Sequence, residues 1–283
     1  MRTVRSVGEL HAALAAWRAA REPVALVPTM GNLHAGHLAL VRRARELAAH
    51  VVVSVFVNPL QFGPSEDYAR YPRTLDADAR LLEGEGVELL WAPAVEDVYP
   101  GGYPPATKVR LAGALAEQLE GAHRPGHFEG VATVVSILFN RVRPELAVFG
   151  EKDWQQLAVI RRMVTDLGWD VRIVGVPTCR AADGLALSSR NQYLSAEERA
   201  RAPALHAALQ AIATQLRAGR RDFDPLCAQQ RARLEARGFR PQYLEVRSPD
   251  LAPPQANARE FVVLAAAYLG TTRLIDNLPV RLE

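Results

Sequence analysis

Short apolar runs alternate, over the first 176 residues, with longer segments in which apolar positions recur every three or four residues. The apolar runs cover residues 24–27, 51–57, 87–91, 146–149 and 171–176. Strands that are buried on both faces of a parallel sheet have this continuous apolar character, whereas the spacing between them is typical of amphipathic helices. The pattern therefore predicts an α/β fold with a parallel, doubly wound sheet.

The segments between these runs predict the helices and loops of the same region. Proline lacks a backbone N–H, so we expect Pro28 to end the first strand. We expect Thr74 to cap a helix that ends near residue 83. The polar stretch 123–130 reads as a loop. Helices are predicted at 6–20, from about 38 to 49, and at 74–83, 112–119, 131–141 and 153–167.

The pattern changes after Pro177. Two long segments rich in Ala, Arg, Leu and Glu, at 196–218 and 224–237, predict helices. Three strand patterns follow at 242–247, 261–268 and 272–280. Helices followed by antiparallel strands are typical of an α+β domain. The chain is thus predicted to comprise two domains, residues 1–176 and a smaller C-terminal α+β domain, residues 177–283.

Composition excludes several classes of protein. The chain has 283 residues, of which 49% are hydrophobic and 23% charged, as in ordinary globular proteins. No apolar run reaches the roughly 20 residues of a membrane-spanning helix, and the first residues do not resemble a signal peptide, so a cytoplasmic protein is expected. Cys179 and Cys227 are too few for a disulfide framework. The net charge of +3 is not gathered in a block, which disfavours a nucleic-acid-binding module and suits small anionic substrates.

The most informative stretch is His34-Ala35-Gly36-His37, which lies where a predicted strand passes into a helix. The N–H groups and the dipole of a helix N-terminus favour anions, and imidazoles can donate hydrogen bonds to phosphate. Gly31 and Gly36 allow close approach of the backbone to a ligand. A solvated turn and a zinc site are the alternatives, although no third zinc ligand is near in sequence.

Two further polar clusters carry phosphate-binding chemistry. Gly150-Glu151-Lys152-Asp153 follows a predicted strand, and Lys152 is one of only two lysines in the chain. Asp153 can cap the helix that follows. Ser188-Ser189-Arg190 offers two hydroxyls and a guanidinium, a set suited to an oxyanion.

His34-x-Gly36-His37 resembles the signature of the nucleotidylyl-transferase superfamily, and the longer string from Pro28 to His37 is similar to the pantothenate synthetase (pantoate–β-alanine ligase) family. Phe149-Gly150-Glu151-Lys152-Asp153-x-Gln155-Gln156, Tyr71-Pro72-Arg73-Thr74 and His123-Arg124-Pro125-Gly126-His127-Phe128 match the family in the same order. Leu187 and Cys179 depart from it, where Met and Val are usual. The resemblance implies a Rossmann-like sheet of the nucleotidylyl-transferase type and a C-terminal lid.

The resemblance also implies a reaction, in which pantoate, ATP and β-alanine give pantothenate, AMP and pyrophosphate through a pantoyl adenylate. Mg²⁺ accompanies ATP, the partners are small molecules rather than nucleic acid or membrane, and the protein is a homodimer. Another nucleotidyltransferase of the superfamily is the alternative. The implied catalytic residues are His34, His37, Lys152, Ser188, Ser189 and Arg190. The implied ATP-binding residues are Met30, Gly31, Asn32, Leu33, His34, Ala35, Gly36, His37, Gly150, Glu151, Lys152, Asp153, Cys179, Leu187, Ser188, Ser189 and Arg190. The implied pantoate and β-alanine residues are Pro28, Thr29, Asn58, Gln61, Tyr71, Arg124, His127 and Gln156, and Asp78 is a candidate to hold Mg²⁺ through water, with Asp76 as a second.

Overall fold

The computed structural model describes residues 1–64 and 66–282. Contacts between residues divide the chain into two compact units. The N-terminal unit comprises Met1–Glu151 and Gln156–Pro177, and the C-terminal unit comprises Lys152–Gln155 and Thr178–Glu283.

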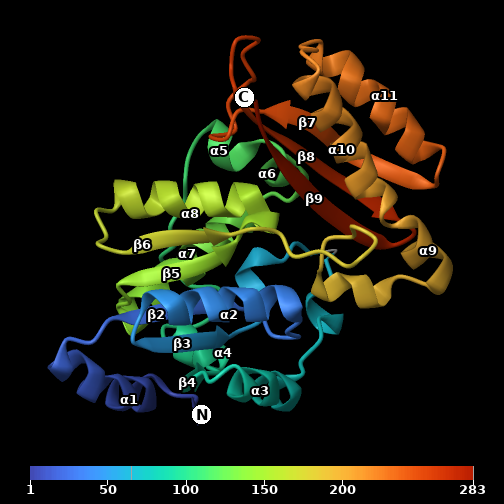
Figure 1. Cartoon of the computed structure of the whole chain (residues 1–283). Coiled ribbons are helices and arrows are strands. Elements are labelled where there is room, and N and C mark those ends of the chain that lie inside the picture. Colours follow the sequence, from blue (N-terminus) through green and yellow to red (C-terminus); the bar gives the residue numbers. More distant parts are fainter. Residues whose placement is uncertain (65, 283) are drawn as a thin grey trace. The chain divides into compact units, whose positions relative to one another are not determined.

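The N-terminal unit is built on a six-stranded sheet in the order β1-β4-β3-β2-β5-β6 (Figure 1). Every neighbouring pair runs parallel, which confirms the predicted fold class. The order reverses between β2 and β5, and ligands of open α/β sheets bind beyond the carboxyl ends of the strands at such a point. The strands are β1 (Arg2–Val4), β2 (Val24–Thr29), β3 (His50–Val55), β4 (Leu89–Trp91), β5 (Leu146–Gly150) and β6 (Arg172–Val176).

Helices cover both faces of this sheet. Apolar side chains of α1, α7 and α8, such as Leu14, Leu138 and Ile160, form a core with one face. Those of α2 and α3, such as Val41 and Leu82, pack on the other face. The helices are α1 (Val7–Ala20), α2 (Ala35–Leu47), α3 (Leu75–Gly84), α4 (Val95–Val98), α5 (Ala114–Glu117), α6 (Glu120–His123), α7 (His127–Val142) and α8 (Trp154–Asp166), with 3₁₀ turns η1 (Pro59–Gln61), η2 (Tyr68–Arg70) and η3 (Glu151–Asp153).

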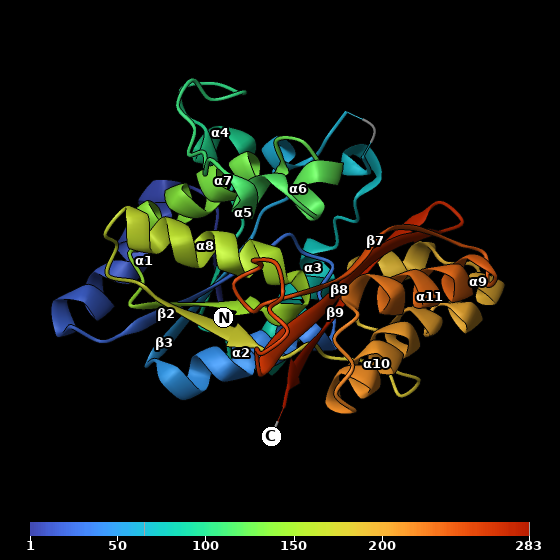
Figure 2. The ribbon, with the colours of Figure 1, turned by 90° about the horizontal axis from the view of Figure 1, so that it is seen from above.

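The C-terminal unit is a three-stranded antiparallel sheet with helices on one face (Figure 2). Apolar side chains of α10 and α11, including Leu209 and Leu234, pack against Phe261 and Val263 of the central strand. The elements are η4 (Ser189–Tyr193), α9 (Ala196–Arg201), α10 (Ala204–Arg217), α11 (Phe223–Glu235), β7 (Phe239–Arg247), β8 (Glu260–Leu269) and β9 (Thr272–Arg281). Across the part of the chain that the structure describes, no helix has both the length and the apolar character needed to cross a membrane.

The expectation that Pro28 ends the first strand is wrong, because β2 continues to Thr29. The Thr29 carbonyl accepts from the N–H of Phe56, beyond the end of β3, so the backbone polar groups of Thr29 point toward β3. Those of Pro28, one residue earlier, therefore point toward β5. The pairing of β2 with β5 covers only Ala25 and Leu26. Proline is therefore tolerated at a strand position where no ladder hydrogen bond is lost.

Two other local predictions are corrected, and one strand was missed. The polar loop expected over 123–130 includes the first turn of α7, which begins at His127 after Gly126, a residue with φ of 82°. The single helix expected over 196–218 is divided into α9 and α10 just before Pro203, whose ring and missing N–H are unfavourable inside a helix. Strand β1 was not predicted, because three residues are too few to show a period.

His50 at the start of β3 joins two carboxylates, with Nε2 2.7 Å from Glu22 and Nδ1 2.8 Å from Glu88. Its ring also stacks on Trp17 at 4.1 Å. Burial alone would lower the pKa of His50, but the hydrogen bonds to Glu22 and Glu88 outweigh it and raise the pKa. Stability from this pair of contacts is therefore fully present below the unfolded pKa of about 6.5 and is lost as pH rises through the higher folded value.

We expect His50→Gln to lose more stability at pH 5.5 than at pH 8.5, by roughly 0.5–1 kcal/mol, because only the protonated ring attracts both carboxylates. The loss of the stack on Trp17 contributes equally at both pH values. Urea unfolding at the two pH values measures the difference. The control is His11→Gln at an exposed position of α1, and a His50→Gln loss independent of pH would contradict the expectation.

Candidate active site

A tight turn follows β2 and carries the residues that precede the two histidines. Gly31 and Asn32 both have positive φ, of 80° and 51°. A Cβ on Gly31 would lie 3.0 Å from Asp78 Oδ2 and 3.0 Å from a methyl group of Val55. Glycine is therefore required here both by the left-handed backbone and by the close packing.

Asp78 of α3 anchors this turn. Its carboxylate accepts from the N–H of Asn32 at 2.9 Å, from the N–H of Leu33 at 2.8 Å and from the Thr74 hydroxyl at 3.2 Å. Asp78 is only 1% exposed, so it is a buried acid and not a solvated one at the helix N-terminus. Thr74 precedes α3 as expected, but its hydroxyl donates to Asp78 and makes no capping bond to the helix. The geometry thus gives Asp78 a structural role in the turn.

We expect Asp78→Asn to reduce the free energy of unfolding by about 2 kcal/mol, since the amide cannot accept from both N–H groups and leaves a buried donor unpaired. The loss should be the same with and without Mg²⁺, as measured by urea unfolding. Asp76→Asn, at an exposed position of the same helix turn, is the control and should cost about 0.5 kcal/mol or less. A loss that appears only when Mg²⁺ is present would instead support a role for Asp78 near the metal ion.

The two histidines cap α2 and each other. Gly36 N–H donates to His34 Nδ1 at 3.1 Å, and His34 N–H donates to His37 Nδ1 at 3.3 Å. The two rings lie 4.1 Å apart between centroids. Because each Nδ1 accepts a backbone proton, each neutral imidazole carries its own proton on Nε2. The arrangement therefore fixes two Nε2–H donors at the N-terminus of a helix, which itself favours anions.

The same geometry disfavours the zinc alternative at this turn. Both Nδ1 atoms are acceptors of backbone hydrogen bonds. Within residues 1–64 and 66–282, no group of three or more His, Cys, Asp and Glu side chains is placed to hold a metal ion. An anion is thus the ligand that this turn suits best.

Asn58, which follows β3, fixes the side chain of Gln61. Its Nδ2 donates to Gln61 Oε1 at 3.0 Å and to the carbonyl of Gly130 at 3.2 Å. Its Oδ1 accepts from the Tyr99 hydroxyl at 2.6 Å and from Leu60 N–H at 3.2 Å. These four bonds use the full capacity of the amide, and Asn58 is 1% exposed. Asn58 therefore orients Gln61 and is not itself available to a substrate.

Gln61 joins the ends of two neighbouring strands. Its Nε2 lies 3.3 Å from the sulfur of Met30, in the turn after β2. The hydroxyl of Thr29, the last residue of β2, donates to the carbonyl of Ser54 at 2.9 Å and accepts from Gly31 N–H at 3.2 Å. The turn with the histidines and the loop with Gln61 thus lie at one edge of the sheet.

Arg124 and His127 brace the backbone of Gln61. His127 Nδ1 lies 2.9 Å from the Gln61 carbonyl and must donate to it, while Nε2 lies 3.0 Å from Arg124. Arg124 also makes two bonds of 2.7 Å to the carboxylate of Glu66. Burial and the charge of Arg124 lower the pKa of His127 to about 4, so its ring is neutral near pH 7. His127 therefore holds the Gln61 backbone directly, and Arg124, bonded to Glu66, holds His127.

Tyr99 and Glu66 belong to this network but were not predicted. Tyr99 is 3% exposed, and burial raises its pKa, which keeps the hydroxyl protonated as a donor to Asn58. Tyr99 lies in a stretch rich in Pro and Gly that reads as a loop. Glu66 carries no motif of its own, so only its spatial contact with Arg124 identifies it.

Other predicted residues of the N-terminal unit occupy varied positions. Gly150 ends β5, which lies next to β2 in the sheet at the point where the strand order reverses. Glu151 follows in η3, and Gln156 is partly exposed on α8. Tyr71 is buried, with its ring edge-on to Phe62 at 5.7 Å, which indicates a packing role.

In the C-terminal unit, the predicted residues near 179–190 form a folded loop. Leu187 N–H donates to the carbonyl of Cys179 at 2.9 Å, and Arg180 pairs with Ala186 as an isolated antiparallel bridge. Ser188 then caps η4, its hydroxyl accepting from Arg190 N–H at 3.3 Å. The hydroxyl and guanidinium groups expected to bind oxyanions thus follow directly on a short, ordered hairpin.

Lys152 is the other predicted cation of the C-terminal unit. Its side chain is 18% exposed, and Nζ lies 3.9 Å from the carboxylate of exposed Asp153. Ion pairs of this length and exposure contribute little to stability. The contact of the Lys152 ammonium with Asp153 therefore contributes little to the stability of the fold.

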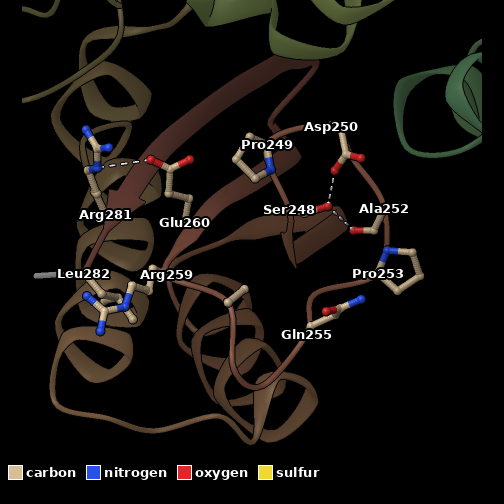
Figure 3. Close-up of a pocket in the computed structure, with 11 residues that line it drawn as sticks. Ser248, Pro249, Asp250, Ala252, Pro253, Gln255, Arg259, Glu260, Arg281 and Leu282 are labelled. Atoms are coloured by element: carbon tan, nitrogen blue, oxygen red, sulfur yellow. Dashed lines mark hydrogen bonds and ion pairs between the residues drawn. The ribbon is translucent and has the colours of Figure 1, made fainter.

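A pocket of about 610 Å³ lies elsewhere in the C-terminal unit, between the 248–258 loop and the start of β8 and end of β9 (Figure 3). Ser248, Pro249 and Asp250 form one wall, and Arg259, Glu260 and Arg281 another. Arg281 is paired with Glu260 at 3.1 Å. None of the residues predicted to bind ATP, pantoate or β-alanine lines this pocket.

The parallel sheet and the histidine-bearing turn at its point of reversal define a fold of the nucleotidylyl-transferase type. A model of the pantoate-beta-alanine ligase family matches residues 2–279, and the chain belongs to this family.

Relatives and solved structures agree with this membership. The chain is 59% identical to the pantothenate synthetase of Thioalkalivibrio sulfidiphilus, over 100% of this chain and 99% of that protein. It is similar to the crystal structure of pantothenate synthetase from Thermus thermophilus, with 53% identity and a TM-score of 0.92 over 98% of this chain and 99% of that one. The pantoate-beta-alanine ligase of Francisella tularensis, solved with beta-gamma ATP and β-alanine, has 31% identity and a TM-score of 0.81 over 98% and 97% of the two chains.

Proposed function

We propose that this chain ligates pantoate to β-alanine with the consumption of ATP, through a pantoyl-adenylate intermediate. The observation that carries the proposal is the pair of Nε2–H donors that His34 and His37 hold at the N-terminus of α2. Membership of the pantoate-beta-alanine ligase family supports it. The Francisella tularensis relative, solved with beta-gamma ATP and β-alanine, supports the nature of the substrates.

The reaction has two steps. A carboxylate oxygen of pantoate attacks the α-phosphorus of ATP, the bond to the bridging oxygen breaks, and pyrophosphate leaves with that electron pair. The amine of β-alanine then attacks the acyl carbon, loses a proton and displaces AMP. Such transfers need positioning and charge neutralisation more than covalent help from the protein.

The proposed residues divide the work between anion binding and recognition. His34 and His37 donate to phosphate oxygens as negative charge develops, and the ammonium of Lys152 and the guanidinium of Arg190 supply positive charge. Ser188 and Ser189 add hydroxyl donors. Gln61 and Gln156 recognise pantoate through neutral amides, which leave its carboxylate nucleophilic.

Mg²⁺ enters, in this proposal, as part of the substrate Mg·ATP. Asp78 is committed to the backbone of the turn at Asn32 and Leu33. The triphosphate oxygens of ATP are themselves suitable ligands for Mg²⁺. The ion then neutralises phosphate charge while the protein positions the nucleotide.

The experiment that tests the function is pyrophosphate release from Mg·ATP with pantoate, with and without β-alanine. We expect release to require pantoate and to continue past one turnover only when β-alanine is present. The other superfamily activity, transfer of a nucleotidyl group to a different acceptor, predicts no release with pantoate. We further propose a homodimer in the cytoplasm, with the C-terminal unit as a lid; light scattering of the purified chain tests the dimer.

A further inference from the structure

The segment Lys152–Gln155 belongs to the C-terminal unit, although the residues on both sides of it in the chain belong to the N-terminal unit. Two hydrogen bonds attach it there. Asn277 Nδ2 of β9 donates to the Lys152 carbonyl at 2.8 Å, and Trp154 Nε1 donates to the Pro249 carbonyl at 3.0 Å. The backbone that carries the Lys152 side chain is thus fixed by a side chain 125 positions away.

Asn277 is held rigidly, because its neighbour Asp276 is the centre of a buried network. The Arg180 guanidinium makes bonds of 2.7 and 2.9 Å to the Asp276 carboxylate and one of 3.0 Å to the Asn277 carbonyl. Asn277 N–H donates to Asp276 Oδ1 at 2.7 Å. Asp276 and Asn277 are 4% and 2% exposed, so water does not compete for these hydrogen bonds.

The same network reaches the hairpin that precedes Ser188. Arg180 lies at the base of that hairpin and donates to the Gly184 carbonyl at 3.1 Å, within the same turn. Successive residues of a strand point to opposite faces, and Asp276 lies 3.5 Å from His206 of α10, on the helix-covered face. Asn277 therefore points to the other face. Two adjacent residues of β9 thus connect the hairpin before Ser188 with the backbone of Lys152.

The second attachment point is equally well ordered. Ser248 N–H donates to the Ala252 carbonyl at 3.1 Å, and Leu251 N–H donates to the Ser248 carbonyl at 2.9 Å. The Ser248 hydroxyl bonds Asp250 and Ala252 across the same turn (Figure 3). The Pro249 carbonyl, which accepts from Trp154 Nε1, thus belongs to a hydrogen-bonded turn.

We propose that Asn277 is a positioning residue for the ligation reaction: it fixes the Lys152 backbone in register with the Ser188–Arg190 segment through the Asp276–Arg180 pair. The inference rests on the proposed function, since it gives Lys152 a role in adenylate formation. A bond to the carbonyl, rather than to the ammonium, leaves the Lys152 charge available to the substrate.

The test is a double-mutant cycle on single-turnover pyrophosphate release with Mg·ATP and pantoate. We expect Asn277→Ala to slow release roughly tenfold in the wild-type background, as for one lost positioning hydrogen bond. In the Lys152→Ala background the same substitution should change the rate less than about twofold, because the group it positions is gone. Trp154→Phe, which keeps an aromatic ring but loses the donor to Pro249, should show a smaller loss, about threefold, with the same dependence on Lys152.

Matched controls are Asn257→Ala, at an exposed position of the 248–258 loop, and Trp169→Phe, an indole that packs on Phe139. Neither should change the rate. The inference would be overturned if Asn277→Ala slowed release equally in both backgrounds, or did not slow it in the wild-type background. Pyrophosphate release by the wild-type protein would still support the proposed function in either case. Wild-type protein that releases no pyrophosphate with pantoate would overturn both, and Trp154→Phe decides the matter if Asn277→Ala fails to fold.

Discussion

His37→Ala is expected to slow pantoate-dependent pyrophosphate release by at least about a hundredfold, the usual cost of removing one donor to developing negative charge. The Nδ1 of His37 accepts from the N–H of His34, which leaves the proton on Nε2 as a donor. The loss should fall mainly on kcat, because the donor acts most strongly on charge that appears in the transition state. Steady-state kinetics over a range of ATP concentrations measures the division between kcat and KM.

A second substitution separates catalysis from helix capping. The side-chain oxygen of His37→Asn can accept from His34 N–H, as Nδ1 does, but the shorter side chain has no donor at the Nε2 position. We expect this variant to be stable and as slow as His37→Ala. His11→Ala, at an exposed position of α1, should be unaffected. An unchanged rate in both His37 variants would remove this residue from the mechanism.

The fold was predictable because the relevant signal is local. Residues such as Ala25, Leu26, Val52 and Val53 are fully buried, and a strand buried on both faces has to be apolar throughout. The histidine turn was predictable for a similar reason, since strand, glycine turn and helix start are consecutive in the sequence. Local patterns of this kind carry both the elements and the order in which they occur.

The contacts that organise the candidate site were not predictable, because they join distant positions. Asp78 meets Asn32 across 46 residues, and Tyr99 meets Asn58 across 41. An acid in the first turn of a helix is explained equally well by the helix dipole, so the sequence could not distinguish a buried anchor from a solvated side chain. The burial of Asp78 and the bonds that join Asn58 to Gln61 and Tyr99 depend on these long-range contacts.

The two lysines of the chain offer a direct test of charge at the phosphates. Lys152→Met, which keeps the length of the side chain and removes the charge, is expected to slow pyrophosphate release about a hundredfold or more. Lys108→Met is the matched control: Lys108 pairs with Glu129 at 2.9 Å with 37% of its side chain exposed, and such surface pairs contribute about 0–1 kcal/mol to stability. Release should therefore change less than about twofold in Lys108→Met. Equal rates in the two variants would mean that the Lys152 charge takes no part in the reaction. A selective loss would place the ammonium at the reacting phosphates, because the 3.9 Å contact with Asp153 is too weak for its loss to explain the effect through stability.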